Sequence, residues 1–324
     1  MSDILDKQEF LKSVEPELKR LEGIRLVKLA DYQFRRMAGL IGGLIVLPIT
    51  GFIDYWLLRA CMGDDCGAGI TLAVLIGIWF WVNGPKRAYA KAYKKKILPS
   101  VAKLFGPFSY DVDGEIPMDE LEPSKIIPHH HRYKSEDHFS GVYKGTKIRF
   151  AEIHLEERRR SRRRTYYVTV FKGLAVLISM KNKNFLGHTI LVKNAGKIVE
   201  WFKEKTDGLK RANLVDPVFE KMFDVYTNDQ VEARYLVDPK IIDRYKDMEE
   251  IYEADDVSAA YYNNELLVLL SSDKNLFEPA GLEVKATKPG SVLKMKQEVE
   301  SILFLVDHLE LYTQEDADDL FQII

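Results

Sequence analysis

Two uncharged apolar runs dominate the first quarter of the chain. The first extends from Met37 to Ile53 and the second from Cys66 to Val82. As helices, runs of about 17 residues would span about 26 Å at ~1.5 Å per residue, close to the ~30 Å hydrocarbon core of a bilayer. A soluble protein would need an unusually large core to bury both runs. The pattern therefore predicts a transmembrane helical hairpin over residues 37–82.

Lysines and arginines lie on one side of this predicted hairpin. Four precede the first run, between Arg25 and Arg36, and seven follow the second, between Lys86 and Lys103, whereas the connecting loop holds one arginine. Positive charge marks the cytoplasmic side of a membrane protein. We therefore expect a two-pass protein of a bacterial inner (plasma) membrane, with both termini cytoplasmic and no cleavable signal peptide.

Small residues in and between the spans raise two structural questions. Cys61 and Cys66 flank the outer loop, and the sequence leaves open whether they form a disulfide or stay as free thiols. Gly39 and Gly43 stand four residues apart, a spacing that lets another helix approach closely. The second span of the same chain is the favoured partner, and a homo-oligomer is the alternative.

Strand signals begin after residue 138. Alternating or β-branched runs separated by turn residues predict an antiparallel meander. The expected strands are Val142–Tyr143 and Lys147–Leu155 about a Lys144-Gly145 turn, then Thr165–Phe171 and Leu174–Met180, then a hairpin of Val257–Tyr262 and Leu266–Ser271 about Asn263-Asn264.

Helical signals surround these strands. A helix capped by Ser13 and another starting at Pro85 would form a cytoplasmic stalk. The last helix starts at Ser291 and carries apolar residues at alternating spacings of three and four, which favours packing on the sheet over pairing with another copy. We expect an α+β fold: a cytoplasmic amphipathic helix over 1–36, the transmembrane hairpin, a juxtamembrane helix and irregular linker over 83–138, and a cytoplasmic domain over 139–324 with an antiparallel sheet and packed helices.

Composition narrows the function classes. Lys+Arg 47 against Asp+Glu 49 gives a net charge of -2, which argues against a protein that coats nucleic acid. Hydrophobic residues make up 46% of the 324 residues, which excludes a mostly disordered chain.

A cluster of six arginines between two expected strands is the main candidate site. Arginine forks suit phosphates, and clustered basic residues are attracted to anionic headgroups. Anionic lipid or an acidic protein is the favoured ligand, nucleic acid is less favoured, and a solvated loop without a ligand remains open. The cluster consists of Arg158, Arg159, Arg160, Arg162, Arg163 and Arg164.

Other candidate chemistry is weaker. His129, His130 and His131 are consecutive, so their side chains alternate and would not converge on a metal ion; we expect no metal site and no cofactor. Glu152 and Glu278 are candidate acids or bases, although no nucleophile or phosphate-loop motif accompanies them. The favoured interpretation is a non-catalytic binding or scaffold module, and the alternative is a membrane-tethered enzyme acting on a phosphate-bearing or lipid substrate. A pocket joining Glu152, Arg234 and Glu278 would favour the enzyme.

Several motifs in order along the chain resemble a bacterial domain-of-unknown-function family. They are Gly141-Val142-Tyr143, Phe150-Ala151-Glu152, Val170-Phe171-Lys172-Gly173, Phe219-Glu220, Phe223-Asp224-Val225-Tyr226, Asp229 to Tyr235, and Leu276-Phe277-Glu278-Pro279. The resemblance implies two N-terminal spans before one cytoplasmic domain, and it implies no activity. The arginine cluster does not match the family's pattern.

The charge asymmetry predicts the topology directly. Reporter fusions at Gly63 and at Ile324 should report opposite compartments, because only the loop between the spans crosses to the outer side. The same compartment for both reporters would contradict the two-span assignment.

Overall fold

The structure is a computed structural model that describes residues 2–60, 69–161, 164–180, 187–193, 208–212, 223–237, 244–245, 247 and 252–309. The chain forms two compact units. One comprises Met1–Ile97 with Glu278–Leu293, and the other comprises Leu98–Phe277 with Lys294–Ile324. The segment boundaries expected after residues 36, 82 and 138 were based on the hydropathy pattern and stay predictions.

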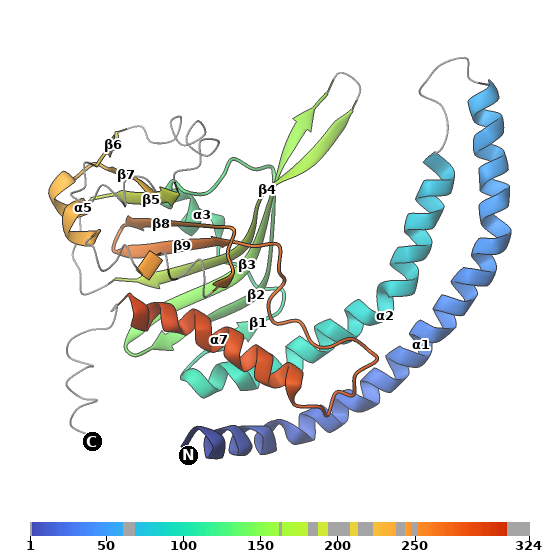
Figure 1. The fold of residues 1–324 in the computed structure, drawn as a ribbon, viewed down its shortest axis with the longest axis horizontal. Coiled ribbons are helices and arrows are strands. Elements are labelled where there is room, and N and C mark those ends of the chain that lie inside the picture. Colours follow the sequence, from blue (N-terminus) through green and yellow to red (C-terminus); the bar gives the residue numbers. More distant parts are fainter. Residues whose placement is uncertain are drawn as a thin grey trace. The chain divides into compact units, whose positions relative to one another are not determined.

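Two long helices form most of the first unit. Helix α1 spans Ser2–Ala60 and α2 spans Gly69–Ala102 (Figure 1). The expectation of separate helices starting near Ser13 and at Pro85 is wrong, because both helices run through these positions without a break. An internal proline removes one backbone hydrogen bond, and the many remaining bonds of such long helices keep them continuous.

One helix among the described residues is long and apolar enough, by length and composition, to cross a membrane: the stretch Gln8–Arg59 of α1. The second expected span lies only partly within the described residues, where its Gly69–Val82 portion opens α2. The α+β class is confirmed in this form, with a long apolar N-terminal helix ahead of a C-terminal antiparallel sheet.

The segment Glu278–Leu293 joins the helical unit, although it follows the sheet in sequence. The Arg25 guanidinium, only 5% exposed, donates to the Leu282 carbonyl at 2.5 Å and also pairs with Glu22. Glu22 in turn accepts the Ala286 amide at 2.7 Å, and Lys94 pairs with Glu278 at 2.6 Å. Charged side chains of α1 and α2 therefore provide hydrogen-bond partners for the backbone of this segment and an ion-pair partner for its Glu278.

The second unit is built on one antiparallel sheet in the order β1-β2-β3-β4-β9-β8-β5-β7-β6 (Figure 1). The strands are β1 Ser109–Asp111, β2 Arg132–Tyr143, β3 Thr146–Arg160, β4 Thr165–Ser179, β5 Thr189–Lys193, β6 Lys210–Arg211, β7 Phe223–Thr227, β8 Asp256–Tyr262 and β9 Glu265–Ser271. The helices are η1 Lys103–Phe105, α3 Met118–Leu121, η2 Glu122–Ser124, α5 Gln230–Leu236 and α7 Gly290–His308.

Both turns expected from sequence are present. Lys144 and Gly145 have φ of 46° and 75°, and Asn263 and Asn264 have φ of 50° and 57°, the positive values that a two-residue turn between twisted antiparallel strands requires. The strands themselves are longer than expected. β2 begins at Arg132, inside the stretch that was expected to be irregular. Its first half is polar and carries no hydrophobic alternation, so no strand signal was visible there.

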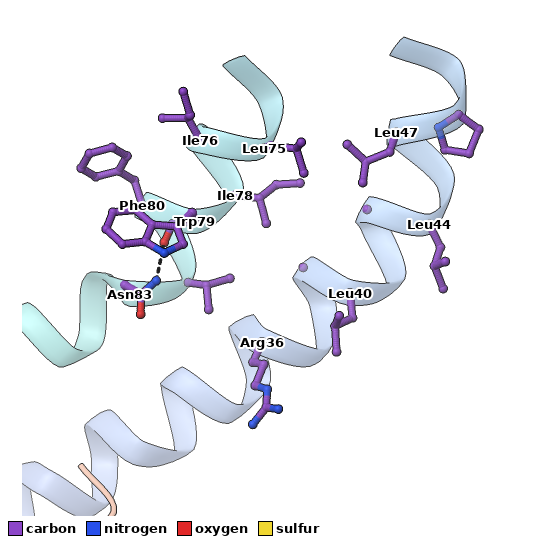
Figure 2. A pocket seen from close by; sticks show the side chains of 14 residues that line it. Arg36, Leu40, Leu44, Leu47, Leu75, Ile76, Ile78, Trp79, Phe80 and Asn83 are labelled. Atoms are coloured by element: carbon purple, nitrogen blue, oxygen red, sulfur yellow. Dashed lines mark hydrogen bonds between the residues drawn. The ribbon is translucent and has the colours of Figure 1, made fainter. Parts of the chain in front are cut away.

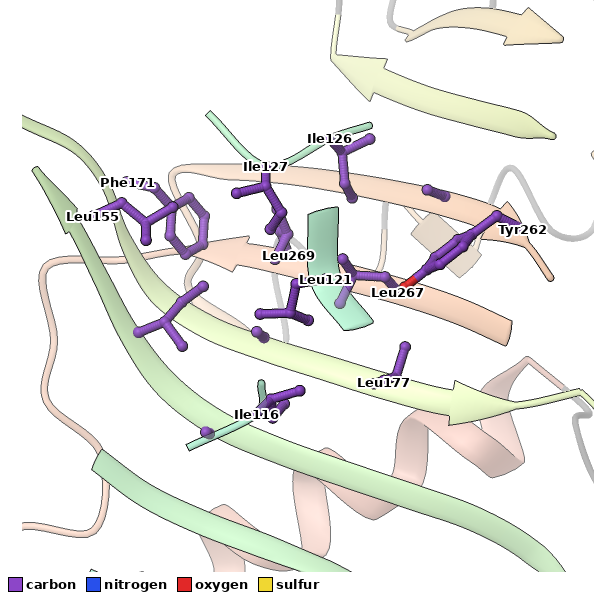
Figure 3. Packing of buried hydrophobic residues seen from close by; sticks show 14 of the residues in the cluster. Ile116, Leu121, Ile126, Ile127, Leu155, Phe171, Leu177, Tyr262, Leu267 and Leu269 are labelled. Atoms are coloured by element: carbon purple, nitrogen blue, oxygen red, sulfur yellow. The ribbon is translucent and has the colours of Figure 1, made fainter. Parts of the chain in front are cut away.

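The sheet buries apolar side chains on both faces. Figure 3 shows one face, where residues of β3, β4, β8 and β9 such as Leu155, Leu177 and Leu269 pack under Ile116–Ile127. On the opposite face Phe139 stacks on Phe150 with ring centroids 4.6 Å apart, and Phe277 lies against both rings.

Helix α7 is hydrogen-bonded to the sheet unit from its middle to its C-terminal end. Asp307 accepts a hydrogen bond from the Tyr143 hydroxyl at 3.0 Å, and Glu298 accepts the Phe277 amide at 2.8 Å. The expectation that this helix packs in the core is confirmed, since the residues of the expected apolar stripe are at most 1% exposed: Val292, Met295, Val299, Ile302, Val306 and Leu309.

Gly173 lets β4 run uninterrupted from the core into the longer β3–β4 pair. Its φ of +149° is rare for residues with a side chain, and a Cβ there would lie 2.0 Å from the Leu270 carbonyl oxygen. Any residue with a side chain at position 173 would therefore strain the backbone and require β9 to move. For this reason the two apolar runs expected on either side of Gly173 form a single strand.

Replacing Gly173 with Ala should destabilise the sheet by about 3 kcal/mol, or roughly 10 °C in melting temperature, through the clash with β9 and the strained φ. Far-ultraviolet circular dichroism of the full chain in detergent measures this. Gly290→Ala is the control, because a Cβ at Gly290 meets nothing within 4 Å. Equal melting of the two variants would contradict the account.

Candidate functional site

The β3–β4 pair extends beyond the rest of the sheet as a free two-stranded hairpin (Figure 1). β2 pairs with β3 only as far as Glu156, and β9 pairs with β4 only as far as Gly173. Past these points the described residues of the two strands pair with each other alone. We call residues 157–168 the arginine hairpin.

The arginines stand opposite aromatic and hydroxyl residues in the hairpin register. Arg158 faces Tyr167, Arg159 faces Tyr166 and Arg160 faces Thr165. All six of these side chains are exposed, and the Ser161 amide donates to the Arg164 carbonyl at 2.8 Å to close the described part of the tip. The backbone ladder therefore holds the arginines on a regular strand.

This arrangement refines the sequence-based expectation. The arginines were expected in a loop, but Arg158–Arg160 belong to β3, and Arg164 immediately precedes β4. Arg162 and Arg163 lie outside the described residues. The backbone hydrogen bonds of a β-ladder form whatever the side chains are. A stretch of charged residues therefore extends a strand when its side chains stay in water.

The base of the hairpin carries further positive charge. Arg132 at the start of β2 lies over the Tyr167 ring, 3.3 Å from its centroid. Arg132 and Lys134 each lie 3.8 Å from the same Glu156 carboxylate oxygen. One acid thus faces two cations, in addition to the arginines farther along β3.

A polar groove of about 680 Å³ continues the same face of β3 toward the core. Glu152 and His154 lie in it, and strand alternation places Glu156, Arg158 and Arg160 on this face beyond the groove. His154 Nε2 lies 2.8 Å from the Thr169 hydroxyl. The groove is lined by three lysines and three acids: Lys134, Lys172, Lys274, Glu136, Glu152 and Asp273.

The three residues proposed to mark an enzyme are not gathered in this groove. Glu152 lines it, but its Oε1 accepts the Leu276 amide at 2.6 Å, a contact that holds the loop after β9. Arg234 is exposed on α5. Glu278 belongs to the helical unit, where it pairs with Lys94.

The histidine run lies beside the base of the hairpin. The His129 and His131 rings contact each other with centroids 5.0 Å apart, and His131 Nδ1 accepts the Arg158 amide at 3.3 Å. Within the described part of the chain, no group of three or more His, Cys, Asp or Glu side chains is placed to hold a metal ion. Cys61 and Cys66 lie outside the described residues.

Sequence reasoning missed the aromatic part of the hairpin. Tyr166 and Tyr167 are 48% and 37% exposed, and Arg132 reaches Tyr167 from a strand 35 positions earlier. The pair of tyrosines directly after the arginines was a readable signal, since exposed tyrosine beside basic residues is typical of membrane interfaces. The contact of Arg132 with Tyr167 depends on the register of distant strands, so no local sequence pattern predicts it.

Comparisons with known proteins identify one family and one distant structure. Residues 169–311, less than half of the chain, match the model of the family described as "Protein of unknown function (DUF3137)". The matched range begins after the arginines of the hairpin. No curated protein sequence matches the chain.

The crystal structure of the mycobacterial trehalose monomycolate transport factor A, TtfA, is similar over 67% of this chain and 94% of that chain, with 11% sequence identity and a TM-score of 0.32. A similarity of this size carries no argument about fold or function. What the comparisons establish is that the second half of the chain, from β4 into α7, contains a DUF3137 domain of unknown function.

Proposed function

We propose that this chain is a two-pass protein of a bacterial inner membrane, with cytoplasmic termini, whose cytoplasmic domain is a non-catalytic module that binds anionic lipid headgroups through the arginine hairpin. The observation that carries the proposal is the hairpin itself, a strand pair free of neighbouring strands with exposed arginines and tyrosines.

Exposure of apolar residues supports the membrane part of the proposal. Only 17% of the most apolar stretch of α1 is buried. Leu44 is 79% exposed, Met37 64% and Trp56 56%. Contiguous apolar surface of this kind is typical of membrane contact and differs from the buried helix of a soluble core. In α2, Trp79 and Phe80 are also exposed, which favours a second span there.

The charge and shape of the hairpin support an anionic ligand. Residues 156–164 hold six arginines and two glutamates, an excess of four positive charges on a short segment. Near an anionic membrane surface each such charge contributes ~1 kcal/mol of attraction. Tyr166 offers a ring that suits the interface between water and hydrocarbon. An acidic protein surface would use the same charges without needing the exposed ring.

A membrane-tethered enzyme acting on a phosphate-bearing or lipid substrate is the second candidate, and the polar groove favours it. His154 and three lysines would contact such a substrate there. Against this candidate, the Glu152 carboxylate holds the Leu276 amide, a structural role that needs no chemistry.

The lipid proposal is tested with a dye on the hairpin. Ser161→Cys, in a chain whose Cys61 and Cys66 are Ser, accepts an environment-sensitive fluorophore, and the labelled protein is placed in nanodiscs. In anionic discs the emission should shift to the blue relative to zwitterionic discs, and added salt should reverse the shift, because screening acts strongly on exposed charges.

Changing all six arginines to Ser should abolish the shift while the melting temperature stays nearly unchanged. The matched variant with six lysines keeps the charge and should retain most of the shift. A shift that persists in the serine variant would overturn the lipid proposal. A large loss of stability would show instead that the arginines are structural.

A further inference from the structure

An apolar groove of about 1100 Å³ lies between α1 and α2 (Figure 2). Figure 2 shows Leu47 of α1 and Leu75 and Ile78 of α2 directed toward one another across this space. Within a bilayer, a space of this size with apolar walls would be filled by hydrocarbon. The groove belongs entirely to the helical unit.

The two helices contact each other at one end of the groove and again beyond its other end. A Cβ at Gly39 would lie 3.1 Å from Val82 Cγ2 and 3.3 Å from Ile78 Cγ2, so α2 closely approaches α1 there. Beyond the other end the Asp54 carboxylate accepts the Thr71 amide at 2.9 Å. Pro48, the last residue of α1 that lines the groove, has no backbone amide N–H and so removes one hydrogen bond of α1 at this point.

One end of the groove is polar and positively charged. Arg36 of α1 and Asn83 of α2 are the lining residues nearest the cytoplasmic ends of the two spans. In the described part of the chain no carboxylate pairs with Arg36, whereas the adjacent Arg35 pairs with Asp31 at 2.8 Å. Arg87 lies 4.6 Å from the centroid of Phe80, another lining residue, and adds a second cation at this end.

We propose that this groove binds one anionic phospholipid of the cytoplasmic leaflet, with an acyl chain along the apolar wall and the phosphate on Arg36. The inference rests on the membrane placement proposed above and is independent of the arginine hairpin. An unpaired guanidinium at the mouth of an apolar groove complements a headgroup joined to a hydrocarbon chain. The cytoplasmic leaflet supplies such lipids.

The walls favour a lipid over a helix from a second copy. Close helix association in membranes uses a stripe of small residues. Of the two glycines that line the groove, Gly39 already receives Ile78 and Val82 of the same chain, which leaves Gly43. The remaining wall consists of long side chains, among them Leu40, Leu44 and Trp79. Such a surface accommodates a flexible acyl chain better than a rigid helix.

The test uses the full chain released from nanodiscs that contain equal phosphatidylglycerol and phosphatidylcholine, with retained lipid counted by native mass spectrometry. The wild type should retain one phosphatidylglycerol per chain. Arg36→Gln should lower the retained ratio of phosphatidylglycerol to phosphatidylcholine about five-fold, corresponding to ~1 kcal/mol for one interfacial charge. Gly43→Leu should lose both lipids, because the side chain fills the groove, where only Leu47 of α1 lies within 4 Å.

Matched controls separate these effects from general damage. Gly42→Leu adds the same bulk beside the groove, where a Cβ meets nothing within 4 Å, and Arg20→Gln removes an α1 arginine that is paired with Glu17. Both should retain lipid as the wild type does. The serine variant of the hairpin should retain it too, so failure of the hairpin proposal leaves this result unchanged.

Three outcomes would overturn the proposal. The first is equal retention of the two lipids, in the wild type and in Arg36→Gln alike. The second is loss of lipid in the serine variant of the hairpin. The third is a dimer of the chain that Gly43→Leu dissociates. The last would assign the groove to a second copy. Because Arg36 is exposed, its substitution tests the headgroup contact without threatening the fold.

Discussion

The antiparallel ladder between β3 and β4 is the interaction on which both the core and the candidate site depend. Its inner half supplies buried residues to both faces of the sheet, among them Phe150 and Leu177. Its outer half continues beyond the neighbouring strands and holds the arginines in register with tyrosines. The position of the exposed charges is therefore set by a ladder whose other end is packed in the core, and Gly173 permits that continuity.

Positive and negative residues are nearly equal in number in this chain, but the positive residues are clustered in a few segments. The net charge of -2 conceals a strongly basic hairpin and basic flanks of the apolar runs. In the described part of the helical unit, the guanidinium of the buried Arg25 is satisfied by Glu22 and by the Leu282 carbonyl, as burial of a guanidinium requires. By contrast the described arginines of the hairpin, Arg158–Arg160 and Arg164, are exposed to water.

Carboxylates that looked alike in the sequence have different surroundings in the structure. Glu152 holds a backbone amide at the edge of the polar groove, and Glu278 pairs with Lys94 in the helical unit. The motifs around these two residues gave no indication of this difference, because their partners, the Leu276 amide and Lys94, are distant in sequence. Both carboxylates make structural contacts, which argues against their use as an acid–base pair.

The sequence by itself determined the features that depend on local patterns. The apolar N-terminal stretch, the Lys144-Gly145 and Asn263-Asn264 turns and the buried stripe of α7 follow from hydropathy, positive-φ residues and helical spacing. Only the tertiary structure decided that β3 carries Arg158–Arg160 and that Glu278–Leu293 returns to α1 and α2. It also decided that Arg132 reaches Tyr167. These outcomes depend on pairing between distant segments, whose energy resides in contacts that no local window of sequence contains.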